Sequence, residues 1–67
     1  MEKMWDKIVK LLFKMNYKDR DLSLIVMSCC QTESRANKMI QYLERNMNVD
    51  LDRNKIIEEA TKIRDEN

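Results

Sequence analysis

Two adjacent cysteines, Cys29 and Cys30, carry the most distinctive chemistry in this chain. Two thiolates can bind a soft metal ion such as Zn²⁺, but a tetrahedral site needs further ligands, and the chain has no histidine and no third cysteine. Adjacent side chains on a helix also point about 100° apart. Because cysteine is among the residues most often buried, we expect both thiols to pack in the core, with a redox or metal role as the alternative.

Carboxylates are the other reactive groups, and their pattern does not predict an active site. Glu58 and Glu59 are adjacent and expected to be exposed, so they would point in different directions and could not act together on one bond. The chain also lacks histidine, the usual general base, and glycine, the usual residue of phosphate-binding loops. We therefore expect a non-catalytic protein with no cofactor, bound metal or small-molecule substrate.

Lysines recur along one face of the first predicted helix, within a stripe about 60° wide. Such a stripe could follow a phosphate backbone or an anionic membrane surface. However, Glu2 and Asp6 lie beside it, and the whole chain has 13 basic against 12 acidic residues, a formal charge of +1. We expect a solvated face, with nucleic-acid or membrane contact as the less favoured alternative. The stripe consists of Lys3, Lys7, Lys10 and Lys14.

Helices must position all these groups, because the chain contains neither glycine nor proline and therefore few helix breakers. Apolar residues recur at i, i+3, i+4 and i+7 in separate segments of the chain. We predict an all-α fold, a compact bundle of four short helices in a single domain spanning residues 1–67. The predicted helices are about 2–15, 18–30, 33–45 and 53–65, and the second, apolar nearly all round, is expected to be the central buried one.

The helix ends have recognisable signals. Asparagine tolerates the left-handed conformation that glycine usually supplies, so we expect Asn16, Asn46 and Asn48 to fill this role. Thr32 and Asp52 are expected to be N-caps. Two pairs have the spacing of a hydrophobic staple, Tyr17 with Leu22 and Leu51 with Ile56.

No run approaches the roughly 18 apolar residues of a membrane span. Adjacent cysteines close a disulfide only with strained geometry, so free thiols in a reducing compartment are expected. These two features favour a cytoplasmic protein.

The segments 18–30 and 33–45 allow a helix-turn-helix hypothesis, in which the second segment would read DNA bases. Three positions disagree with the motif: Val26 stands where a small residue is needed, Cys30 where glycine makes the turn, and Gln31 where an apolar residue is needed. A DNA-binding regulator is therefore the alternative function. Its candidate base-contacting residues are Ser34, Arg35, Asn37, Lys38 and Gln41.

Residues 8–43 resemble a ubiquitin-associated (UBA-like) three-helix domain. The resemblance rests on Met15-Asn16-Tyr17, which matches the family's Met-Gly-Phe/Tyr loop, and on Ala36 followed by Met39 and Ile40. Asn16 replaces the loop glycine, Gln41 replaces a common leucine, and a fourth helix follows. The resemblance implies an apolar patch, formed by the loop and the end of the third helix, that holds a partner, often ubiquitin.

Protein interaction is the function that these features favour. Exposed methionine side chains adapt to the shape of a partner. Aromatic side chains often contribute most of the binding energy at protein interfaces. The partner is expected to be another protein or a second copy of the chain, bound through the loop or through the surplus apolar edge of the first helix. The candidate partner-binding residues are Met15, Asn16, Tyr17, Ile40, Val9 and Phe13.

Overall fold

The computed structural model describes residues 4–66 and confirms the all-α bundle. Its four helices are α1 (Met4–Lys14), α2 (Arg20–Cys29), α3 (Glu33–Arg45) and α4 (Arg53–Glu66). The start of the predicted first helix and Lys3 lie outside the described residues. The predicted boundaries of α3 are confirmed, whereas α2 is shorter at both ends than predicted.

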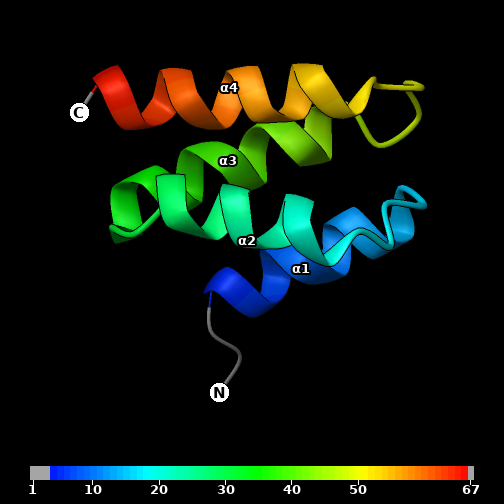
Figure 1. Cartoon of the computed structure of the whole chain (residues 1–67), viewed down its shortest axis with the longest axis horizontal. Coiled ribbons are helices and arrows are strands. Elements are labelled where there is room, and N and C mark those ends of the chain that lie inside the picture. The colour runs from blue at the N-terminus through cyan, green and yellow to red at the C-terminus, as the bar shows by residue number, and fades with distance from the viewer. Residues whose placement is uncertain (1–3, 67) are drawn as a thin grey trace.

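Helix α3 lies between α1 and α4, and α2 packs across α1 and α4 (Figure 1). Every helix contributes apolar residues to one core, so burial of apolar surface from all four segments holds the bundle together. The buried residues are Ile8, Leu11, Leu12, Leu22, Val26, Cys29, Cys30, Ala36, Met39, Ile40, Leu43, Ile56, Ala60 and Ile63.

Helix α2 is not the central buried helix, so that prediction was wrong. Its side chains Leu22, Val26 and Cys29 are buried, but Leu24 is 55% exposed and Ile25 is 36% exposed. The neighbouring helices cover only one face of α2. Apolar residues on its other face therefore remain exposed to solvent. Helix α3 takes the central position. Its apolar stripe is narrower, but the whole stripe faces the core, and this is sufficient to pack the helix there.

The turn after α1 is a Schellman motif built on asparagine. Asn16 has a φ of 70°, the Asn16 N–H donates to the Phe13 carbonyl at 3.0 Å, and the Tyr17 N–H donates to the Leu12 carbonyl at 2.9 Å. The prediction for Asn16 is therefore confirmed. Among residues 4–66, Asn16 is the one non-glycine residue with a positive φ, so the same prediction for Asn46 and Asn48 was wrong.

Asn46 ends α3 in another way. Its φ is −113°, and its side-chain Nδ2 donates to the Tyr42 carbonyl at 2.7 Å. The last turn of a helix leaves carbonyls without backbone donors. Here the Asn46 side chain supplies a donor to one of them, so a left-handed residue is not needed for this purpose.

A side-chain cap marks the start of α3, and backbone hydrogen bonds mark the start of α4. Thr32 accepts from the Arg35 N–H at 3.2 Å, which confirms it as the N-cap of α3. Asp52 directly precedes α4, and its carbonyl accepts from the N–H of buried Ile56, which confirms its predicted position. Half-buried Leu51 packs against the same core.

Helix α2 begins one residue later than the predicted staple requires. Asp19 is its N-cap, so the N′ position belongs to Lys18 and the pairing of Tyr17 with Leu22 as a staple was wrong. Tyr17 instead belongs to the Schellman turn of α1 and packs against the core.

Candidate functional site

Large apolar side chains remain exposed on α1 and α2. Phe13, at the end of α1, is 52% exposed, Leu24 and Ile25 lie in the middle of α2, and Val49, in the loop between α3 and α4, is 52% exposed. Single exposed apolar residues are ordinary, whereas a contiguous apolar patch indicates a contact surface. Helices α1 and α2, which carry three of these residues, contact each other.

Two of the predicted partner-binding residues, Val9 and Phe13, follow Trp5 along α1. The Trp5 indole Nε1 donates to the Cys30 carbonyl, just beyond α2, at 2.7 Å. Val9 and Phe13 follow at intervals of four residues, which moves each only about 40° further around the helix. Half-buried Val9 and exposed Phe13 therefore lie about 40° and about 80° around α1 from Trp5. We call Val9, Phe13, Leu24 and Ile25 the α1–α2 apolar surface.

The loop after α1 offers less surface than the UBA-like resemblance implies. Asn16 is exposed, but Met15 and Tyr17 are half-buried and pack against the core. Burial raises the pKa of Tyr17, and the nearby carboxylates of Asp50 and Asp52 raise it further. The loop between α3 and α4 therefore lies close to the Tyr17 hydroxyl.

Ile40 is not part of a surface patch. Its side chain is only 6% exposed and belongs to the core, so the structure does not join it to the Met15–Tyr17 loop as a binding face. The three-helix pattern treats the end of the third helix as open, whereas here α4 packs against α3.

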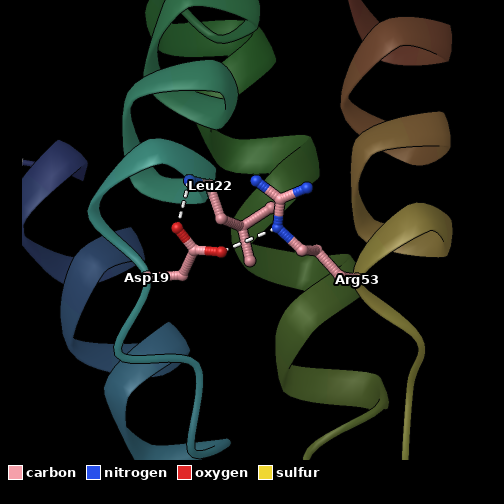
Figure 2. A network of polar contacts seen from close by, with 3 residues as sticks. All are labelled: Asp19, Leu22 and Arg53. Atoms are coloured by element: carbon pink, nitrogen blue, oxygen red, sulfur yellow. Dashed lines mark hydrogen bonds and ion pairs between the residues drawn. The ribbon is translucent and has the colours of Figure 1, made fainter.

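An ion pair that the sequence analysis did not predict joins the starts of α2 and α4. Figure 2 shows Asp19 accepting from the Leu22 N–H at 3.2 Å with Oδ1 and from Arg53 Nε at 2.7 Å with Oδ2. The hydrogen bond from Arg53, followed by that from Leu22, lowers the pKa of Asp19. No local signal in the sequence marks this contact, because the two residues are 34 positions apart. This contact joins the start of α2 to the start of α4, two helices that also pack against each other.

The lysine stripe of α1 is exposed at Lys7, Lys10 and Lys14. It is not purely basic, because Lys7 Nζ lies 4.0 Å from Glu44 Oε2 on α3. Both side chains are about half exposed, at 49% and 52%, so this pair contributes little to stability. The carboxylate of Glu44 lowers the positive potential that a phosphate backbone would meet.

The predicted base-contacting face of α3 is mostly exposed, at Ser34, Asn37, Lys38 and Gln41, with Arg35 half-buried. Lys38 and Gln41 line a groove of about 190 Å³ between α3 and α4, whose other side includes Glu59 and Glu66. Glu59 is half-buried there, so its predicted exposure was wrong. Burial, followed by Glu59 and Glu58, raises the pKa of Tyr42 in the same groove. Acidic side chains thus stand beside the surface that would have to approach DNA.

Both cysteines are buried free thiols, which confirms their predicted place in the core. Burial, followed by the charge of Cys29, raises the pKa of Cys30 to about 11. Among residues 4–66, no three histidine, cysteine or acidic side chains are grouped closely enough to hold a metal ion.

Comparison of the chain with protein-family models, with curated proteins and with solved structures finds no match. Within the described part of the chain, no helix has the length and apolar character needed to cross a membrane.

Proposed function

We propose that this chain is a small non-catalytic protein-interaction module that binds its partner through the α1–α2 apolar surface. The observation that carries the proposal is the exposure of Phe13 and Leu24, both more than half exposed on neighbouring helices. Exposed apolar area of this kind contributes about 25 cal/mol per Å² when a partner covers it. Aromatic side chains such as Phe13 are enriched among residues that dominate interfaces.

A UBA-like topology of α1, α2 and α3 is part of this proposal, but the binding surface differs from the one that the resemblance implies. Ile40 is buried and Tyr17 is half-buried, which weighs against ubiquitin held at the end of α3. The exposed residues favour the outer side of α1 and α2 in its place. The partner is another protein or a second copy, and we place the interaction in the cytoplasm.

DNA binding through α3 is the less supported alternative. Glu44 lies beside the lysine stripe, and Glu59 and Glu66 lie beside Lys38. A DNA-binding surface gains its affinity from continuous positive charge along the phosphate backbone.

Capture from an extract of the source cells tests the proposal with matched variants. The double variant Phe13→Asn/Leu24→Asn removes the two most exposed apolar side chains of the surface and leaves the core intact. The control variant Lys38→Asn/Gln41→Asn changes two exposed positions on α3. Circular dichroism should confirm that both variants remain helical.

We expect the unmodified chain and the control variant to capture a protein that the Phe13/Leu24 variant does not capture. Equal capture by all three chains would overturn the proposal. Salt-dependent binding of duplex DNA that only the Lys38/Gln41 variant loses would favour the alternative.

A further inference from the structure

One end of the bundle carries two exposed apolar residues with opposite charges beside them. Figure 1 shows the end of α1 and the loop between α3 and α4 at the same end of the molecule. Asp50 in that loop lies close enough to Tyr17, in the turn after α1, to raise its pKa, which agrees with the picture. The two segments are thus parts of one molecular end.

The α1 side of this end is basic. Phe13 is 52% exposed, and the exposed lysines Lys10 and Lys14 lie three residues before it and one residue after it. Side chains three residues apart on a helix lie on the same side, so Phe13 is accompanied by positive charge.

The loop side of this end is acidic. Val49 is 52% exposed, and the exposed carboxylates of Asp50 and Asp52 follow it. Arg53 does not cancel this charge fully, because its guanidinium is held by Asp19 at 2.7 Å. The loop therefore offers an apolar side chain with negative charge, the complement of the α1 side.

We propose that a second copy of the chain docks on this end in a two-fold dimer. Phe13 and Lys14 of one copy contact Val49 and Asp50 of the second copy, and the symmetry repeats the same contacts in the opposite direction. A second copy is the favoured occupant because both complementary halves are already present on one surface. This inference rests on the proposed function: it names one partner and shares Phe13 with the α1–α2 apolar surface, and it adds Val49 of the loop between α3 and α4.

Hydrogen bonds order the segments on either side of this end. The Schellman turn follows Phe13, and the Asp19–Arg53 contact lies at the start of α4, just after the loop. Segments that are already ordered lose less conformational entropy on binding. Because the apolar part is small, the dimer is expected to be weak and sensitive to salt, with a Kd of about 1 mM or somewhat below.

Charge reversal tests this pairing without disturbing the core. Lys14→Glu and Asp50→Lys each place like charges against one another twice in a dimer of identical copies. We expect each variant to lower the association constant about tenfold, measured by sedimentation equilibrium of the full chain at low salt. Lys62→Glu is the matched control, because Lys62 is exposed near the other end of α4 and should leave association unchanged.

An equimolar mixture of the two single variants provides the sharpest readout. In a mixed dimer, Glu at position 14 of one copy meets Lys at position 50 of the other, and the second contact keeps the natural pair. The mixture should therefore associate more strongly than either variant alone, which a general loss of folding could not produce.

Association that the charge reversals do not change would overturn the proposed pairing. A chain that stays monomeric at about 1 mM in low salt would overturn the second copy as partner. In that case, capture of a different protein that depends on Phe13 and Leu24 would still support the proposed function. If the chain neither self-associates nor captures such a protein, both proposals are wrong.

Discussion

Glycine and alanine substitutions at Asn16 and Asn46 should have opposite orders of stability. At Asn16 the φ of 70° places the Cβ of any L-residue in a crowded position, and both Schellman hydrogen bonds depend on that backbone conformation. Alanine keeps the Cβ and lacks the polar side chain that lets asparagine tolerate this region. Asn16→Ala should therefore lower the free energy of unfolding by about 1 kcal/mol.

Glycine removes the steric cost at the same position, and its greater freedom in the unfolded chain offsets part of the gain. Asn16→Gly should therefore match or exceed the original stability and lie about 1 kcal/mol above the alanine variant. For a domain of this size, that difference corresponds to about 4–8 °C in Tm.

At Asn46 the backbone φ is −113°, so glycine has no steric advantage. Both substitutions remove the Nδ2 donor to the Tyr42 carbonyl at 2.7 Å, a loss of about 1 kcal/mol. Glycine adds a backbone entropy cost of about 0.5–1 kcal/mol, so Asn46→Ala should be the more stable variant.

Urea unfolding followed by circular dichroism measures all four variants under the same conditions. The glycine variant should be more stable than the alanine variant at position 16, and the alanine variant more stable than the glycine variant at position 46. The same order at both positions, or an alanine variant at position 16 as stable as the original, would refute this prediction.

Three further predictions concern the tertiary contacts. Trp5→Phe keeps an aromatic ring but removes the donor to the Cys30 carbonyl at 2.7 Å, so thermal melts should show a loss of about 1 kcal/mol. Burial raises the pKa of Cys30 from 9.0 to about 11, so the unfolded thiol ionises first and stability should decrease as pH rises from about 9 to about 11. Urea titrations across this range should show a smaller decrease for Cys30→Ala, and an equal decrease would contradict the assignment. The hydrogen bond from Arg53 lowers the pKa of Asp19, so this contact stabilises the fold above the ordinary carboxyl pKa and is lost as pH falls through the lowered value. NMR titration should show the Asp19 pKa moving up in Arg53→Gln, and no movement would show that the ion pair is not populated.

Local signals predicted the helices and several of their ends. Thr32 and Asn16 have roles set mainly by their own side chains and nearby backbone, and both predictions are confirmed. Asn46 shows the limit of the same argument, because its side chain found a carbonyl acceptor and made the left-handed backbone unnecessary.

Long-range packing could not be predicted in this way. The contacts of Trp5 with Cys30 and of Asp19 with Arg53 join residues 25 and 34 positions apart, and they depend on how the helices cross. The apolar run of α2 was misinterpreted for the same reason: hydrophobicity alone does not say whether a neighbour covers Leu24. The candidate binding surface could therefore be identified only from the exposure of side chains in the fold. Ile40, predicted to belong to the loop patch, is buried in the core.

The most direct test of the interaction surface is an NMR titration of the isotope-labelled full chain with the protein isolated by capture, or with unlabelled chain if the partner is a second copy. With a captured protein, shift changes are expected at Phe13 and Leu24 and their neighbours Val9 and Ile25. With unlabelled chain, they are expected at Phe13, Lys14, Val49 and Asp50. The amides of 34–41 on α3 should stay unchanged in both titrations. Shift changes confined to 34–41, or none at the expected residues on saturation, would contradict the proposed surface.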